Sequence, residues 1–269
     1  MNISRTTAIV LRHFYLIRGS PSRIIPIFAW GTIDIVLWGF ITKYLNAVTA
    51  ATAGINFVAM FLGAVLLWSF FIRTMQGVTM TFFEDVWSRN FLNIFATPLS
   101  ISEYLSGLVL SSIVTSIIAF IILLLVAMTV FGFSIMVYGI MIIPFLLVLF
   151  LSGIAFGIFG TAVVLRLGPA AEWFIWPIPA IISPFVGVFY PITTLPIWMQ
   201  CISRLLPPSY VFEGIRKVVL GGSVSETTLA IGGGLAIVFI LLACWFFSRI
   251  YHHAVRTGLI ARYSAETVS

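Results

Sequence analysis

Charged residues are scarce in this sequence: only 8% of its 269 residues are Asp, Glu, Lys or Arg, whereas 61% are hydrophobic. A soluble globular domain usually contains roughly 25% charged residues, so this composition excludes an ordinary soluble protein. The apolar residues form long continuous runs, unlike the ~10-residue alternating segments of a membrane β-barrel. We therefore expect an all-α polytopic membrane protein.

Thiols and enzyme motifs are also nearly absent. The two cysteines are Cys201 and Cys244. We expect Cys201 outside the membrane and Cys244 within the last span, so a disulfide framework is excluded. The sequence has no GxxxxGK(S/T) phosphate loop, no GxSxG nucleophile elbow and no HExxH helix, so we expect no catalytic site and no ATP bound by this chain. His13, His252 and His253 have no cluster of other ligands beside them, and we expect no metal site.

The apolar runs predict six transmembrane helices, since each crossing needs roughly 20 residues. The fifth run is broken by Pro177, Pro179 and Pro184. We expect no secretory signal peptide, because residues 1–23 are arginine-rich and lack an apolar core before a small-residue cleavage site. The expected spans belong to a single transmembrane domain over residues 1–269 and lie at about 24–42, 57–78, 104–130, 135–165, 172–190 and 229–248.

The basic residues predict the orientation of these spans. Ten of the 14 Lys and Arg residues fall in segments that this arrangement places inside, which follows the positive-inside rule and puts both termini in the cytoplasm. Arg73 is expected close enough to the inner surface to snorkel. The net charge is +6, and the basic residues flank apolar spans, so we expect contacts with membrane lipids and none with nucleic acid. We expect the protein in a bacterial cytoplasmic membrane.

Residues 4–19 predict an N-terminal helix with two distinct sides. The pattern is typical of an interfacial helix on an anionic leaflet, and the alternative is a basic cytoplasmic tail. The apolar side carries Val10, Leu11, Phe14 and Ile17, and the other side carries Arg5, Arg12 and His13.

The first span carries one carboxylate near its middle. Trp30, Asp34 and Trp38 recur every four residues and are expected to share one face. A carboxylate at this depth costs roughly 2.5–3.5 kcal/mol on insertion scales, so Asp34 should face a partner or a wet cavity. It is either a polar group on a substrate path or subunit seam, or a protonated or hydrogen-bonded structural Asp.

Residues 81–103 predict a short cytoplasmic helix between the second and third spans. Glu84 and Asp85 would begin it, where acidic side chains suit the positive end of the helix dipole, and Pro98 would end it. The residues expected to contact a partner protein are Glu84, Asp85, Trp87, Arg89, Phe91 and Pro98. An ordinary connecting helix is the alternative.

The segment from residue 178 to residue 222 differs from the other apolar runs. A proline-broken stretch leads to two amphipathic pieces, 197–206 and 210–220, separated by Pro207-Pro208. Non-helical backbone inside a membrane is tolerated only where protein buries it or where it lines a wet cavity. The segment therefore predicts an amphipathic extracytoplasmic hairpin at the opening of a pathway.

This segment carries a family resemblance. Its motifs resemble the C-terminal signature of ABC-2 type permeases, the membrane subunits of one class of ATP-binding-cassette exporters, and residues 81–103 resemble the coupling helix of the same family. The motifs are Ser183-Pro184-Phe185, Phe189-Tyr190-Pro191, Leu195-Pro196-Ile197-Trp198, Leu206-Pro207-Pro208 and Glu213-Gly214-Ile215-Arg216.

The resemblance implies a homodimer or a heterodimer of permeases joined to two copies of a separate ATPase, which binds ATP and Mg²⁺. It implies export of a lipid, a lipid-linked glycan or polysaccharide, or a hydrophobic drug. The residues expected along the substrate path or dimer seam are Trp30, Asp34, Trp38, Phe185, Phe189 and Tyr190. The expected re-entrant motif contains Pro191, Pro196, Pro207, Pro208, Glu213 and Arg216.

Two other functions are weaker alternatives. An ion-coupled secondary carrier usually needs several buried charges and paired broken helices. The predicted spans contain very few ionisable groups, chiefly Asp34, and only the fifth span is clearly broken. A membrane-embedded transferase would need clustered carboxylates or histidines, which the sequence lacks.

Overall fold

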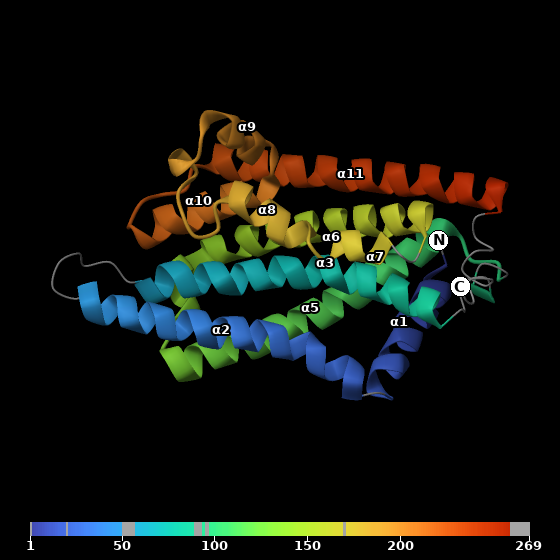
Figure 1. Ribbon diagram of the computed structural model, residues 1–269, viewed down its shortest axis with the longest axis horizontal. Helices are drawn as coiled ribbons and strands as arrows, with labels where there is room; N and C mark the ends of the chain where they lie inside the picture. Colours follow the sequence, from blue (N-terminus) through green and yellow to red (C-terminus); the bar gives the residue numbers. More distant parts are fainter. Residues whose placement is uncertain are drawn as a thin grey trace.

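The computed structural model describes residues 2–19, 21–49, 57–88, 93–94, 97–168 and 171–258, and within these ranges the chain forms helices and short connections without a β-strand. Figure 1 shows an elongated bundle whose longest helices run along one axis. Helix α1 (Ile3–Arg18) lies at one end of this bundle. The α9–α10 hairpin lies at the opposite end (Figure 1).

Four helices are long and apolar enough to cross a membrane. At 1.5 Å per residue their 30–33 residues extend about 45–50 Å, which exceeds the ~30 Å hydrocarbon core. They contain the runs predicted as spans at 57–78, 104–130, 135–165 and 229–248. The helices are η1 with α3 (Val58–Leu62 and Gly63–Trp87), α5 (Ile101–Phe131), η2 with α6 (Ile135–Met141 and Ile142–Leu167) and α11 (Glu226–Thr257).

Helix α2 (Pro21–Thr49) contains the predicted first span and extends beyond both of its ends. Its 29 residues extend about 43 Å. The helix continues to Thr49, beyond the end of the predicted span at about residue 42. α2 lies against α5 at two glycines: a Cβ on Gly39 would lie 2.3 Å from the Phe131 ring, and one on Gly31 would lie 2.8 Å from Leu123.

The fifth predicted span, 172–190, is not one continuous helix. It consists of α7 (Glu172–Ile175) and α8 (Ile178–Val186), so the predicted break at the prolines is confirmed. The apolar stretch Trp173–Val186 extends only about 21 Å as a helix, less than the hydrocarbon core. α8 ends at Gly187, whose φ of 66° is available to glycine without strain.

The predicted amphipathic hairpin is confirmed as α9 (Ile197–Leu205) and α10 (Pro207–Val219), preceded by the short η4 (Ile192–Thr194). The paired prolines occupy the first two positions of α10, where a missing N–H costs nothing because that group has no intrahelical acceptor. α9 leaves apolar side chains such as Ile197 and Trp198 exposed.

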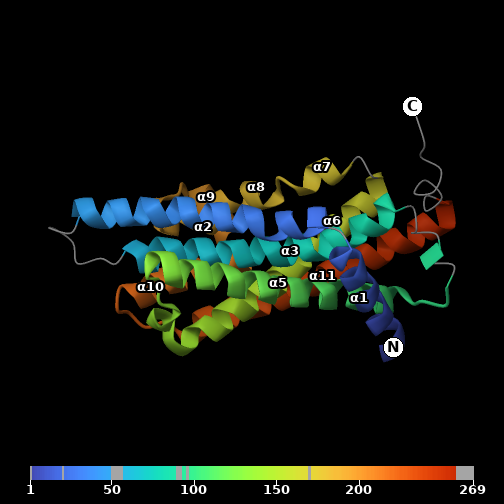
Figure 2. The ribbon, with the colours of Figure 1, turned by 90° about the horizontal axis from the view of Figure 1, so that it is seen from below.

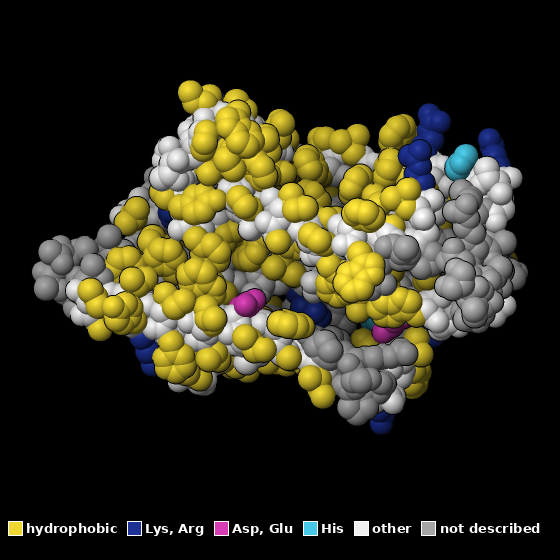
Figure 3. Space-filling view, viewed as in Figure 1, with side chains coloured by type: hydrophobic (Ala, Val, Ile, Leu, Met, Phe, Trp, Pro, Cys, Tyr) yellow, Lys and Arg dark blue, Asp and Glu magenta, His cyan; other side chains and the backbone are white. Residues whose placement is uncertain are grey.

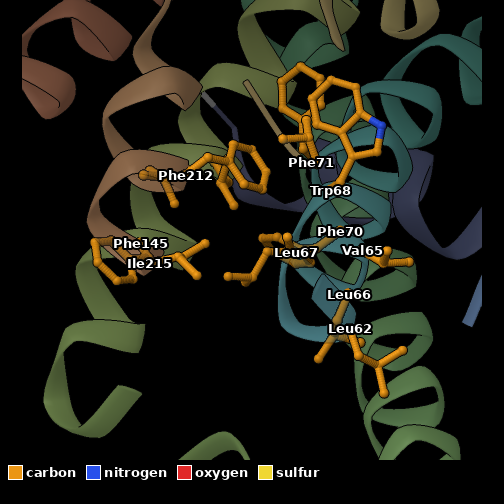
Figure 4. Close-up of a cluster of buried hydrophobic side chains, with 14 of the residues drawn as sticks. Leu62, Val65, Leu66, Leu67, Trp68, Phe70, Phe71, Phe145, Phe212 and Ile215 are labelled. Atoms are coloured by element: carbon orange, nitrogen blue, oxygen red, sulfur yellow. The ribbon is translucent and has the colours of Figure 1, made fainter. Parts of the chain in front are cut away.

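Two clusters of buried side chains hold the long helices together. Figure 4 shows part of the first, in which aromatic rings of α3 meet α6 and α10. Trp68 stacks on Phe71 with centroids 4.9 Å apart. Small residues bring α6 against α3: a Cβ on Gly157 would lie 2.8 Å from the carbonyl oxygen of Met75, so the backbones approach closely.

The prediction that Glu84 and Asp85 begin a separate coupling helix is wrong. α3 continues unbroken to Trp87, and Ser88 caps it by donating its N–H to the Glu84 carbonyl at 3.0 Å. The helix continues because Phe82, Phe83 and Val86 pack into the second buried cluster. The two carboxylates thus lie at the negative end of a helix dipole, an unfavourable place that needs compensating cations.

Candidate functional site

Those cations come from α1, whose polar side faces the protein. The predicted N-terminal helix is confirmed, with Thr6, Ile9 and His13 buried. Leu11 and Phe14 on the opposite side are exposed and free to contact lipid. The polar side of α1 therefore packs against α3 and α5 and does not lie on headgroups.

Asp85 is the centre of the contact between α1, α3 and α5. Its side chain is fully buried, forms an ion pair with Arg12 of α1 and accepts a hydrogen bond from the Tyr104 hydroxyl of α5 at 2.8 Å. Beside it, His13 Nδ1 lies 2.9 Å from Glu84 Oε2. Burial lowers the pKa of the Arg12 guanidinium, which remains charged at neutral pH. These contacts compensate the carboxylates at the end of α3.

A second set of bonds ties α1 to the start of α5. Glu103 and Ser100 form a capping box at the N-terminus of α5, and Glu103 also accepts a bond from the backbone N–H of Asn2 at 2.6 Å. Arg5 lies 3.6 Å from Glu103 Oε2 and donates to the carbonyl oxygen of Pro98. The segment before α5 is therefore bound directly to α1.

A cavity of about 320 Å³ opens between α1 and this segment. It is lined on one side by Arg5, Ile9 and Arg12 and on the other by Ile94 and Pro98. Its apolar walls and two guanidinium groups suit a protruding apolar or acidic side chain of a partner protein. Among the other predicted coupling residues, Trp87 is half-exposed, whereas Arg89 and Phe91 lie outside the described residues.

The predicted face of Trp30, Asp34 and Trp38 is only partly correct. Trp30, which is 71% exposed, and Asp34 face outward, but Trp38 turns inward and stacks on Phe189 with centroids 4.4 Å apart. Eight residues at 3.6 per turn rotate Trp38 about 80° from Trp30, which is enough to place the two indoles on different sides. Asp34 forms no hydrogen bond or ion pair with any described residue.

Arg73 is a charged group that the sequence pattern misplaced. It was expected near the inner surface, but it lies midway along the Val58–Trp87 helix. Its Nε atom is buried without a hydrogen-bond partner, and no described residue forms an ion pair with it. At 1.5 Å per residue, Asp34 lies about 20 Å along α2 from Pro21, and Arg73 lies about 21 Å along α3 from Trp87.

α2 and α3 run antiparallel (Figure 1), and the unpaired carboxylate and the unpaired guanidinium each lie near the middle of their own helix. The face over α2 is largely hydrophobic, with an acidic and a basic group near its middle (Figure 3). The continuous hydropathy of α3 beyond residue 78 was the signal that locates Arg73 in mid-helix.

At the other end of the bundle, Arg216 holds the re-entrant segment together. It donates to the Gly187 carbonyl at 2.7 Å and to Glu213 Oε1 at 2.9 Å, and the same carboxylate oxygen accepts the Ile192 N–H at 2.8 Å. The α8 terminus and the following loop are thereby fixed to α10. Figure 2 shows α8 and α9 along the same edge as α2, where Phe189 meets Trp38.

Several predicted residues gather in this outer region. A cavity of about 220 Å³ is lined by Phe189, Pro191 and Arg216 together with Phe61 and Phe212. Two other predicted path residues, Phe185 and Tyr190, do not line this cavity and make contacts around α8.

The Tyr190 hydroxyl donates to the Pro184 carbonyl at 2.8 Å, and Phe185 meets Trp198 edge-on at 6.3 Å. Pro196 caps α9.

Long apolar helices are here combined with a proline-broken segment and the hairpin of α9 and α10. Residues 6–220 match the profile described as ABC-2 type transporter. The chain belongs to the ABC-2 type transporter family. It is also similar to nodulation protein J of Rhizobium leguminosarum bv. trifolii, at 34% identity over 85 residues, and to that of Rhizobium meliloti (strain 1021), at 32% over 85 residues.

Each of these alignments covers 30% of this chain and 32% of the relative, so the chain spans about a third of the length of the curated relatives that it matches. Membership identifies the chain as the membrane-spanning component of an ABC-2 type transporter. Among the described residues, no group of three or more His, Cys, Asp or Glu side chains is placed to hold a metal ion.

The sequence missed several residues of this ABC-2 type transporter that the structure brings to functional positions. Arg12, His13 and Tyr104 were not recognised as partners of Asp85 and Glu84, because they lie on other helices. Their pairing depends on how α1 folds back on the bundle, which no local pattern records.

Proposed function

We propose that this chain is the permease subunit of an ATP-driven exporter and that a separate ATPase subunit supplies the energy. The match of residues 6–220 to the ABC-2 type transporter family carries this proposal. The unpaired charges of Asp34 and Arg73 support it, since ionisable groups inside a membrane protein usually line transport paths or pair with partners.

A second permease subunit, in a homodimer or a heterodimer, is proposed to cover the outward face of α2. The exposed side chains of this face recur at helical spacing and include Trp30, Ile33, Leu37 and Phe40. Lipid would suit these four residues, but a lipid-facing Asp34 would cost roughly 2.5–3.5 kcal/mol. The substrate path is therefore proposed to run along α2 and α3, past Asp34 and Arg73, toward Phe189.

Two copies of the ATPase, which bind ATP and Mg²⁺, are proposed to contact residues 84–98 and α1. Arg12 binds Asp85, and Arg5 binds the Pro98 carbonyl, so α1 and this segment should move as one unit. Displacement of that unit would act on the ends of α3 and α5, which extend toward the middle of the bundle.

Six crossings are proposed within one transmembrane domain over residues 1–269. α2 supplies the first, and α7 and α8 together with the residues after Gly187 supply the fifth. Both termini then lie in the cytoplasm of a bacterial cell, and the hairpin of α9 and α10 lies outside.

The cargo is proposed to be a lipid, a lipid-linked glycan or polysaccharide, or a hydrophobic drug. Aromatic rings such as Trp30, Phe189 and Tyr190 suit sugar faces or acyl chains. Arg73 would favour a cargo with an anionic group, because a buried guanidinium gains most from a phosphate or carboxylate partner.

Purification of the tagged full-length chain from its native membrane tests this proposal. We expect an ATP-binding-cassette subunit to copurify in equal amount and to hydrolyse ATP in the presence of Mg²⁺. We also expect vesicles containing the complex to move cargo only when ATP is supplied. Transport driven by an ion gradient without nucleotide would contradict the proposal and favour a secondary carrier.

A further inference from the structure

An open apolar groove lies between α6 and α11. It has a volume of about 380 Å³. Phe156 and Phe159 of α6 form one wall, and Phe239, Leu242 and Trp245 of α11 contribute to the other. Phe159 and Trp245 are exposed, so the groove opens on the outer surface of the bundle.

The groove continues toward a cluster of basic side chains. Trp245 also lines a second hollow of about 440 Å³, whose other residues include Arg249, His253 and Arg256. The Arg249 guanidinium lies 5.4 Å from the centre of the Trp245 ring. Figure 3 shows basic and histidine side chains projecting at this end of the bundle.

A further arginine reaches the same level from α6. Arg166 follows Phe159 by seven residues, which is close to two helical turns, so it lies on the groove side of α6. It is exposed. Within the described ranges, neither Arg166 nor Arg249 forms a hydrogen bond or an ion pair with another residue. Two helices thus present free guanidinium groups at one end of the groove.

The dimensions fit one leaflet of a bilayer. From Phe239 to Arg249, α11 rises about 15 Å, and half of a ~30 Å hydrocarbon core is also about 15 Å. A phospholipid whose acyl chain lies in the groove would therefore have its phosphate beside Arg249. Basic pockets between transmembrane helices at a membrane surface are suited to anionic lipid headgroups, and Trp245 is an aromatic side chain at the level that such residues favour.

We infer that this groove binds an anionic phospholipid, with an acyl chain along Phe159 and Leu242 and the phosphate between Arg166 and Arg249. The site is independent of the cargo path and of the proposed energy source. It requires only that α6 and α11 lie in a bilayer. A lipid held across both helices would stabilise their contact.

The test uses the purified full-length chain, with any subunits that copurify, in a mild detergent. Phosphatidylglycerol and phosphatidylcholine with identical acyl chains are added separately, and bound lipid is counted by native mass spectrometry while the melting temperature is recorded. We expect phosphatidylglycerol to bind at least tenfold more tightly and to raise the melting temperature. Equal binding of the two lipids would overturn the inference.

Variants distinguish the two parts of the site. Arg166→Gln with Arg249→Gln should remove the preference for phosphatidylglycerol, whereas Arg204→Gln with Lys217→Gln, the same charge change at the other end of the bundle, should keep it. Leu242→Trp should fill the groove and weaken binding without altering charge. Retained preference in the Arg166→Gln, Arg249→Gln variant would contradict the headgroup site.

Glycerol phosphate separates a lipid site from a simple anion site, because it carries the phosphate without acyl chains. We expect it not to displace phosphatidylglycerol at equal concentration. Full displacement of phosphatidylglycerol by glycerol phosphate, or unchanged lipid binding in Leu242→Trp, would contradict the inference that an acyl chain lies in the groove. Each variant is compared after size-exclusion chromatography without added lipid, so that a folding defect is recognised before lipid is counted.

Discussion

The indole of Trp38 stacks on the ring of Phe189, with centroids 4.4 Å apart and planes 13° from parallel. Trp38 belongs to α2, and Phe189 follows the αL glycine at the end of α8. The pair therefore joins the first long helix to the broken fifth segment. This contact should transmit any motion of α2 to the segment that follows α8.

We predict that Trp38 and Phe189 are energetically coupled. Stacked aromatic pairs contribute about 0.5–1.5 kcal/mol beyond the area that they bury, and a double-mutant cycle of Trp38→Ala and Phe189→Ala should measure this value in thermal or denaturant unfolding. Trp30→Ala is the control, because Trp30 is exposed and forms no ring contact with a described residue. Strict additivity of the two Ala variants would contradict the coupling.

We predict that the Asp85 carboxylate is needed for the protein to fold, whether or not it also takes part in coupling ATP hydrolysis to export. Asp85→Ala leaves Arg12 and the Tyr104 hydroxyl without their partner, and breaking a buried ion pair costs about 3–5 kcal/mol. The yield of folded protein after size-exclusion chromatography should fall sharply. Glu226→Gln removes an exposed carboxylate at the other end of the bundle and should have no such effect.

Removal of both charges separates packing from partner contact. Arg12→Gln with Asp85→Asn keeps the shapes without a buried unpaired charge, so the yield should recover substantially. If Asp85 instead serves mainly as an ATPase contact, Asp85→Asn alone will fold normally and lose only the link between ATP hydrolysis and export. A normal yield of Asp85→Ala would refute the structural role.

The Arg216 guanidinium is predicted to fix the re-entrant loop. Arg216→Gln removes bonds to the Gly187 carbonyl and to Glu213, and hydrogen bonds to charged groups are worth about 1.5–3 kcal/mol. The melting temperature should fall, and protease should cut more readily between residues 187 and 196. Arg216→Lys should recover little, since an ammonium lacks the planar fork that reaches both acceptors. Lys217→Gln, exposed on the same helix, is the matched control.

The proposed orientation can be tested with thiols. Cys201 is exposed on α9, whereas Cys244 lies within α11. In sealed cells an impermeant maleimide should label the unmodified chain, and Cys201→Ser should abolish that labelling. In that background Thr257→Cys should react only after the cells are permeabilised. Labelling of Thr257→Cys in intact cells would reverse the orientation.

Hydropathy predicted the long helices well, because burial in lipid depends on composition over about 20 residues. The run predicted at 104–130 became α5 at Ile101–Phe131, which ends at the αL residue Gly132. The broken fifth segment followed directly from its prolines. These features depend on local covalent geometry and solvation, which a single sequence records.

Features that depend on distant partners were not predicted correctly. Glu84 and Asp85 look like the start of a helix, yet they end α3 because Arg12 and His13 from another helix compensate them. Arg73 was expected close to the inner surface because the predicted span ended at about residue 78. α3 nevertheless continues to Trp87, since its second half packs against α1 and α5 inside the protein.

The last prediction concerns the two unpaired charges. If Asp34 and Arg73 line the path, Asp34→Asn and Arg73→Gln should each assemble normally yet reduce export about tenfold to a hundredfold, the equivalent of losing one charged hydrogen bond of about 1.5–3 kcal/mol. Export is measured on the cargo that accumulates in cells lacking the chain, together with ATP hydrolysis by the purified complex. Arg204→Gln, an exposed charge outside the spans, should leave both unchanged.

A charge exchange distinguishes cargo binding from mutual pairing. Asp34→Arg with Arg73→Asp keeps one positive and one negative charge at these two positions, so export should recover if the two residues act by pairing with each other during transport. If they contact cargo or the second permease subunit, the exchange should fail although the protein assembles, and this is the result that we expect. Asp34→Leu tests whether residue 34 simply faces lipid. A leucine in contact with lipid is more favourable than an aspartate, so in that case the variant should be as stable as the unmodified chain or more stable. Wild-type export and assembly in Asp34→Leu would therefore show that the outward face of α2 has no role in transport.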